Sequence, residues 1–237
     1  MACIGMAENR FSKQRCNNLV INIEGDSGAH FLNQTDIRML ATENGGDALA
    51  GSRLNEVRLS DVEARIKSNK LIKKCQVYRD LKGNLVINVE QERPLARWIH
   101  SSPNGQWRNA SGRYINEEGA FFPLSDSYSA RTLLVTGPYF LSRKNLKSEK
   151  DKGLLDLIRF LDEDPFWKAQ VAQVEVGNDG EISLLTLLGD QRIEFGTSEG
   201  FEKKFKKIRL FYERVLSQDW GRFSKISVKF QDQIVCE

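Results

Sequence analysis

The chain has 237 residues, of which 40% are hydrophobic and 28% charged, the balance of a soluble globular protein with enough apolar side chains for a real core. Its 35 basic and 32 acidic residues leave a net charge of +3, which is too small to indicate nucleic acid or an anionic membrane as a partner. A typical domain has about 100–200 residues, so the length allows one or two domains.

The segment 1–16 is expected to be a membrane-proximal tail. Residues 2–7 are small and apolar, and the charged Glu8, Arg10 and Lys13 follow at once. This pattern is typical of a truncated membrane exit, the last turns of a membrane helix that meets water, although a disordered tail fits the same residues equally well. The sequence has no run of 18 or more apolar residues, so no complete membrane-spanning helix is expected.

Residues 17–92 have the pattern of a small β-α-α-β-β domain. Leu85, Ile87 and Val89 share one parity, the period of a half-buried strand. Ser60 and Glu63 have the spacing of a capping box, with Ser60 as the N-cap of a helix. The expected elements are a strand at 19–23, a helix from residue 33 or 35 to the glycines 45 and 46, a helix from residue 60, and strands at about 71–79 and 84–93 joined by a turn at 80–84.

Residues 93–237 are expected to form a mostly antiparallel β domain with flanking helices, which makes the chain an α+β protein. Pro94 marks the boundary, because proline cannot donate a hydrogen bond to a sheet ladder. The expected elements are a hairpin at 114–123, a strand at 133–135, a charged exposed link at 144–152, a helix over 154–161 that ends before residue 165, strands at 171–176, 181–188 and 191–195, a long helix over 201–215, and a closing strand over 224–235.

No group of residues has the spacing of a catalytic, metal or cofactor site, so we do not expect an enzyme. Cysteines at positions 3, 16, 75 and 236 have no CxxC spacing, and two histidines cannot build an ordinary zinc site. A disulfide between Cys16 and Cys75 would be allowed in an oxidising compartment, and free thiols are the alternative. The acidic run 162–164 lies at a helix end, where acids are unfavourable, so a local contact is expected to offset the cost.

The basic run 202–209 is the strongest charge cluster. It could bind phosphates or lipid headgroups, or it could be the solvated face of an amphipathic helix whose aromatic face lies in the core. We favour the solvated face, since the sequence shows no second basic stripe or aromatic platform.

Three segments, in order, resemble the FtsQ/DivIB family of bacterial cell-division proteins. Residues 89–98, VEQERPLARW, are similar to the x-P-x-A-R-W exit of that family's POTRA domain. Residues 114–123, YINEEGAFFP, look like the Y-I-D-x-x-G-x-x-F hairpin that opens its β domain, and residues 226–235, ISVKFQDQIV, are similar to its closing strand. The resemblance implies a POTRA domain over 17–92 and the family's β domain over 93–237.

The resemblance also implies a function. The family members are non-catalytic divisome scaffolds of the bacterial inner (cytoplasmic) membrane, and this region would lie on the periplasmic side and act at septation. Expected partners are FtsB-like and FtsL-like proteins, with other septal membrane proteins at the POTRA domain. Membrane attachment would come from a single N-terminal helix absent from this chain. A POTRA-bearing outer-membrane assembly or secretion accessory protein is the alternative, although such proteins usually carry several POTRA copies or a barrel.

The closing strand is the expected partner site, because an exposed edge strand offers unpaired N–H and C=O groups to a partner strand. Its alternation directs Ile226, Val228 and Phe230 to the core and the residues between them outward, where Lys229 would favour an acidic partner. The expected partner-binding residues are Ser227, Val228, Lys229, Phe230, Gln231, Gln233 and Ile234.

Overall fold

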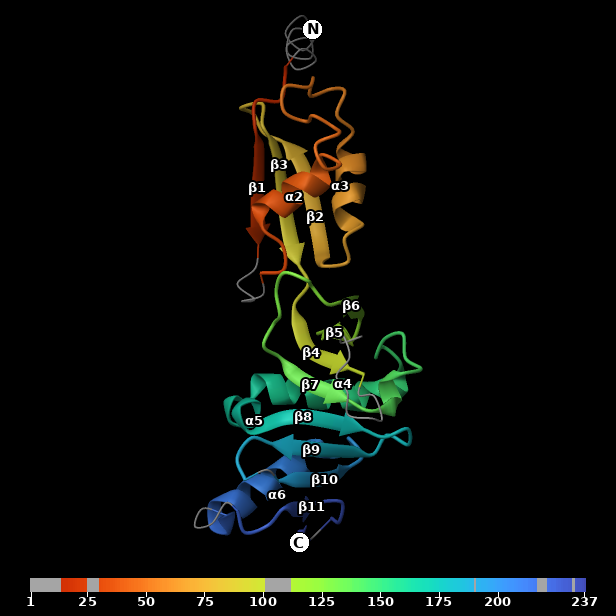
Figure 1. Cartoon of the computed structure of the whole chain (residues 1–237), viewed down its shortest axis with the longest axis vertical. Coiled ribbons are helices and arrows are strands. Elements are labelled where there is room, and N and C mark those ends of the chain that lie inside the picture. Colours follow the sequence, from red (N-terminus) through yellow and green to blue (C-terminus); the bar gives the residue numbers. More distant parts are fainter. Residues whose placement is uncertain (1–13, 25–29, 101–111, 190, 217–220, 232) are drawn as a thin grey trace, which may run out of the picture. The chain divides into compact units, whose positions relative to one another are not determined.

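The computed structural model describes residues 14–24, 30–100, 112–189, 191–216, 221–231 and 233–237. The chain divides into two compact units (Figure 1). The first contains Met1–Arg93 together with Ser125–Ser129, and the second contains Pro94–Leu124 and Ala130–Glu237. Each unit has its own hydrophobic core. Within the described ranges, no helix is long and apolar enough to cross a bilayer.

The first unit has the predicted β-α-α-β-β order. Its elements are β1 (Leu19–Glu24), α2 (Gln34–Ala41), α3 (Leu59–Lys67), β2 (Ile72–Arg79) and β3 (Leu85–Gln91). The sheet order is β1-β3-β2, with β3 in the middle, parallel to β1 and antiparallel to β2. This arrangement confirms the fold class predicted for the N-terminal part of the chain.

The predicted alternation in β3 is confirmed by burial. Leu85, Ile87 and Val89 are completely buried, in one cluster with Ile37 of α2 and Ile66 of α3. Both helices therefore cover the same face of the three-stranded sheet. The cluster also includes Cys16 and Cys75, which are free thiols, so the structure has no disulfide between them. Residues 1–13 of the predicted tail lie outside the described residues.

The predicted capping box at Ser60 and Glu63 is wrong. Helix α3 begins at Leu59, its N-cap is Arg58, and no side chain caps it. The Glu63 carboxylate instead accepts a hydrogen bond from the N–H of Val77 in β2. A tertiary hydrogen bond has therefore replaced the local one.

The capping box of this unit belongs to α2. The Asn33 side chain accepts hydrogen bonds from the N–H groups of Thr35 and Asp36, and the Asp36 carboxylate accepts one from the Asn33 N–H at 2.8 Å. The sequence prediction placed the start of this helix correctly at residue 33 or 35.

The second unit is built on a nine-stranded sheet with the order β12-β11-β10-β9-β8-β7-β4-β5-β6. Neighbouring strands are antiparallel except for the pairs β4–β7, β7–β8 and β10–β11. The strands are β4 (Pro94–Ile99), β5 (Gly112–Asn116), β6 (Phe121–Pro123), β7 (Leu133–Thr136), β8 (Val171–Val176), β9 (Ile182–Thr186), β10 (Arg192–Gly196), β11 (Lys225–Ser227) and β12 (Val235–Cys236).

Three α-helices pack on this sheet: α4 (Glu149–Glu163), α5 (Pro165–Gln170) and α6 (Phe201–Arg214). Aromatic rings join them, since the Phe205 ring lies 5.0 Å from Phe160 and 4.7 Å from Trp167. A short 3₁₀ helix, η1 (Pro138–Phe140), follows β7. The long amphipathic helix expected over 201–215 is confirmed.

Strand β4 was not predicted. Its first residue is Pro94, which the sequence analysis took as the end of the sheet, and the strand lies inside the sheet between β7 and β5. Proline is tolerated at the first position of a strand because its missing N–H interrupts no pairing there.

Helix α4 begins earlier than predicted. The predicted exposed link at 144–152 is helical from Glu149, and its Asp151 is buried. The acidic run at the end of α4 does have the expected compensating contacts. Asp164 is the N-cap of α5, which follows immediately, and Asp162 pairs with Lys168 at 2.7 Å.

Candidate partner interface

The C-terminal end of the sheet is formed by two short strands instead of one long one. β11 has only three residues and pairs with β10 on one side and with β12 on the other. The expected open edge at 226–230 is therefore wrong for Ile226 and Ser227, whose outer side is covered by β12. Since β12 is the last strand of the sheet, the edge lies at Val235–Cys236.

The predicted parity holds only in part. Ile226 and Val228 are buried as expected, and the Val228 N–H donates to the Glu194 carbonyl at 3.0 Å. However, Ser227 is only 8% exposed, although it was expected to face outward, and Phe230 is 51% exposed, although it was expected in the core. Ser227 is covered because it lies between Glu194 of β10 and Val235 of β12. Regular pairing ends at Ser227, so the period of a strand no longer governs Phe230.

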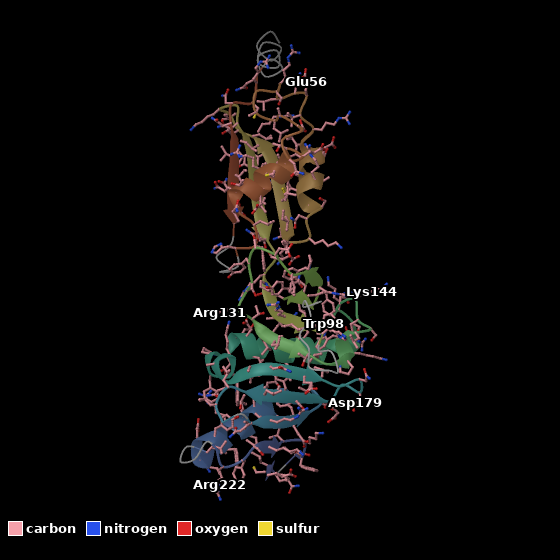
Figure 2. All side chains as sticks on the ribbon, viewed as in Figure 1. Glu56, Trp98, Arg131, Lys144, Asp179 and Arg222 are labelled. Carbon is pink, nitrogen blue, oxygen red and sulfur yellow. The ribbon has the colours of Figure 1, made fainter. Side chains whose placement is uncertain are left out.

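Lys207 of α6 holds the segment between β11 and β12. Its ammonium group donates to the backbone carbonyls of Phe230, Gln231 at 3.4 Å and Gln233 at 3.2 Å. Lys229 of the same segment pairs with Glu181 at 2.7 Å, and this hydrogen bond raises the pKa of the lysine. The segment is thus shaped by side chains from α6 and from the β8–β9 connection, where Figure 2 marks Asp179.

A surface cavity of about 460 Å³ lies between α6 and this segment. Of the predicted partner-binding residues, it brings together Val228, Lys229, Phe230 and Gln231. Ser227 and Val228 are in or next to the core, and Gln233 and Ile234 lie on the approach to β12. The lysines of the cavity that sequence reasoning did not assign to the site are Lys203, Lys204 and Lys207.

The basic run therefore has a divided role. Lys204 donates to the carbonyls of Phe195 at 3.1 Å and Thr197 at 2.8 Å, and burial lowers its pKa. Together with Lys207 it stabilises the backbone next to α6, whereas Lys203 and Lys206 are exposed. The spacing of Lys203 and Lys207, four residues apart on one helix face, is the sequence signal that could have located these lysines together.

Among the described strands, β12 has a neighbour only on its β11 side. Glu237 and Lys225 exchange two backbone hydrogen bonds, 3.0 Å and 3.1 Å long, and Cys236 stands opposite Ile226. Because an antiparallel ladder alternates, the N–H and C=O of Cys236 point away from β11. Val235 beside it is 41% exposed.

The charges at this end are arranged in a row across three strands. Lys225 of β11 lies 3.0 Å from Glu194 of β10 and 3.7 Å from the Glu237 side chain. The hydrogen bond to Lys225 lowers the pKa of Glu194, and the pKa of Lys225 is raised by the same contact. Both groups are thus charged and paired at neutral pH.

Comparison with known families agrees with this division into two parts. Residues 107–237 match the family model described as FtsQ/DivIB, C-terminal related, and residues 14–90 match the POTRA-like domain model. No curated protein matches the chain. The two matches suggest a cell-division scaffold role, in a family of non-catalytic scaffolds, and a membrane-anchored periplasmic domain. Among the described residues, no cluster of three His, Cys, Asp or Glu side chains could hold a metal ion.

Proposed function

This chain belongs to the FtsQ/DivIB C-terminal related family, and we propose that it is the periplasmic part of a membrane-attached divisome scaffold that binds FtsB-like and FtsL-like partners by β-strand addition. One observation carries the proposal: β12 ends the nine-stranded sheet, and the outward N–H and C=O of Cys236 are available to a further strand.

The other sheet edges are less suited to strand addition. At β1, Gln34 donates to the Ile21 carbonyl at 3.1 Å and Arg38 to the Leu19 carbonyl at 3.4 Å, which occupies groups that a partner strand would need. At the far end of the large sheet, β6 contains Pro123, which has no N–H to offer. These features favour β12 as the pairing edge.

The surroundings of β12 favour an acidic partner. Lys229 already pairs with Glu181, so its charge is partly compensated. Lys203 and Lys206 on α6 are exposed, and Phe230 offers an apolar ring in the same cavity as Lys203. A partner strand with carboxylates near an apolar side chain would complement this surface.

Substitution at Cys236 tests the proposal. Cys236→Pro removes the outward N–H, whereas Cys236→Ala keeps the backbone and removes only the thiol. With the full chain and an FtsB-like periplasmic segment, we expect the proline variant to lose binding and the alanine variant to bind within about threefold of wild type. Circular dichroism and thermal melting check that both are folded. A folded Cys236→Pro protein with unchanged affinity would rule this edge out.

A further inference from the structure

A buried carboxylate in the second unit organises a group of polar side chains away from β12. Asp151, in the first turn of α4, is 1% exposed. It accepts hydrogen bonds from the hydroxyls of Tyr139, at 2.6 Å, and Ser148, and the Arg143 guanidinium lies 3.5 Å away. A buried carboxylate is unfavourable unless it is paired and hydrogen-bonded, and these three donors provide that compensation.

The Asp151 contacts also fix the position of Arg143. Its guanidinium stacks over the Tyr139 ring, 4.5 Å from the ring centroid, while it pairs with the carboxylate. Arginine held on two sides keeps its remaining N–H donors in a defined direction. Those donors lie at the wall of a pocket.

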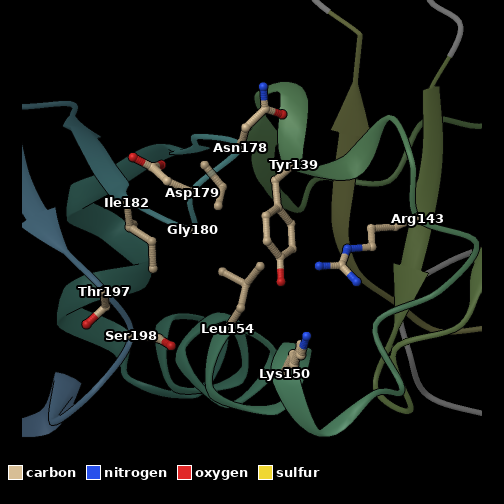
Figure 3. A pocket seen from close by; sticks show the side chains of 11 residues that line it. Tyr139, Arg143, Lys150, Leu154, Asn178, Asp179, Gly180, Ile182, Thr197 and Ser198 are labelled. Atoms are coloured by element: carbon tan, nitrogen blue, oxygen red, sulfur yellow. The ribbon is translucent and has the colours of Figure 1, made fainter.

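The pocket has a volume of about 320 Å³ and a divided lining (Figure 3). Arg143 and Lys150 lie on the side of the Tyr139 hydroxyl, and Ile182 lies on the opposite side with Thr197. Leu154, Val176 and Ile182 supply the apolar lining, and Ser198 adds a hydroxyl. Tight packing supports this wall, since a Cβ on Gly153 of α4 would come within 2.6 Å of the Ser198 hydroxyl oxygen.

The charge of the pocket favours an anion. Asp151 compensates Arg143, but Lys150 forms no ion pair with any residue that the structure describes. The carboxylate of Asp179, which also lines the pocket, accepts a hydrogen bond from the Glu181 N–H at 3.1 Å and lies on the opposite side from Arg143 in Figure 3. One cationic charge therefore remains uncompensated on the Arg143 side, next to an apolar floor.

We propose that this pocket binds an alkyl carboxylate, with the carboxylate between Arg143 and Lys150 and the alkyl part on Leu154 and Ile182. The C-terminal residue of a peptide and a glutamate side chain both present this chemistry. The volume is at the lower end of ligand pockets, which suits a single residue. The proposal is independent of strand addition at β12, because the pocket contains no residue of β12 and none of the predicted partner-binding residues.

Short peptides and the ¹⁵N-labelled full chain provide the test. The first probe is acetyl-alanyl-leucine with a free carboxylate, the second is its C-terminal amide, and the third is a blocked peptide with a central glutamate. We expect the free acid to shift the amide signals of Lys150, Gly180 and Ser198, and the leucine amide to leave them unchanged. A response to the third peptide as well would assign the site to carboxylate side chains in addition to chain ends.

Two lysine variants locate the charge. Lys150→Gln should weaken binding of the free acid by about tenfold, the loss expected for one charge-assisted hydrogen bond. Lys152→Gln, on the same helix but outside the pocket, should leave binding unchanged. Equal binding of acid and amide, equal effects of the two variants, or no shift of the three signals at saturating peptide would each overturn the proposal.

Discussion

The Glu63 carboxylate of α3 accepts a hydrogen bond from the backbone N–H of Val77 in β2 at 2.8 Å. The backbone N–H of Val77 points to the free side of β2, which is an edge strand of the three-stranded sheet. At the opposite edge, the side chains of Gln34 and Arg38 of α2 donate hydrogen bonds to backbone carbonyls of β1. Helix side chains therefore satisfy backbone groups on both edges, a device that protects small sheets from unwanted strand pairing.

Removal of the Glu63 carboxylate should expose this edge. Glu63→Ala leaves the Val77 N–H without its acceptor, and we expect a loss of about 1–2 kcal/mol of unfolding free energy. Glu63→Gln keeps a carbonyl acceptor and should lose less. Urea denaturation gives the free energies, and hydrogen exchange reports on the Val77 amide. An unchanged exchange rate at Val77 in the alanine variant would contradict this role.

The buried Asp151 should matter more for stability than an exposed acid of the same helix. Asp151→Ala leaves Arg143 and Tyr139 without their shared acceptor, and we expect a loss of about 2–4 kcal/mol. The control is Asp156→Ala, which breaks a partly exposed pair with Arg159 and should cost about 0.5 kcal/mol. Denaturation of both variants in urea provides the comparison. Equal losses would show that burial adds nothing.

Alkaline pH should destabilise the first unit through Cys75. Burial raises the pKa of this thiol from 9.0 to about 11, with a further contribution from the Glu63 carboxylate. The unfolded chain therefore loses the thiol proton at lower pH than the folded chain. This contribution to stability is complete below pH 9 and is lost as the pH rises to 11.

The size of this pH effect should be about 2–3 kcal/mol. We expect Cys75→Ala to be less stable than wild type at neutral pH, because it leaves a small cavity, but to show a flatter decline between pH 9 and 11. Urea denaturation at several pH values measures both slopes. Parallel slopes would assign the alkaline loss to other groups, such as Tyr212, whose pKa burial raises to about 12.

The elements that the sequence predicted well have strong local patterns. The alternation of Leu85, Ile87 and Val89 correctly predicted a strand. The spacing of Phe205, Ile208 and Tyr212 correctly predicted a helix. Each pattern was clear because it extends over several residues of its element. Local chemistry also located the start of α2 at Asn33. These features need no knowledge of distant residues.

The misassigned features depend on long-range contacts. Strand β12 has two residues, and it exists because Glu237 bonds to Lys225 across the intervening segment. Glu63 has the spacing of a capping residue, but its acceptor oxygen is taken by Val77, fourteen positions away. The outer edge of the candidate site could therefore not be read from alternation.

Lys207 links the stability of the C-terminal segment to the proposed partner edge. Its ammonium group donates to three carbonyls between β11 and β12, so Lys207→Ala leaves those acceptors to solvent and frees the segment that leads to β12. We expect a loss of about 1–2 kcal/mol in global stability. Hydrogen exchange at residues 229–236 should increase strongly while the core of the unit stays protected.

Binding of an FtsB-like segment should weaken, because the edge is no longer held in an extended form. Lys206→Ala is the matched control for stability and exchange, since this exposed neighbour donates to none of the three carbonyls and should leave both unchanged. If the Lys207 variant releases the segment in exchange measurements but binds its partner as tightly as wild type, the partner does not depend on a preformed β12.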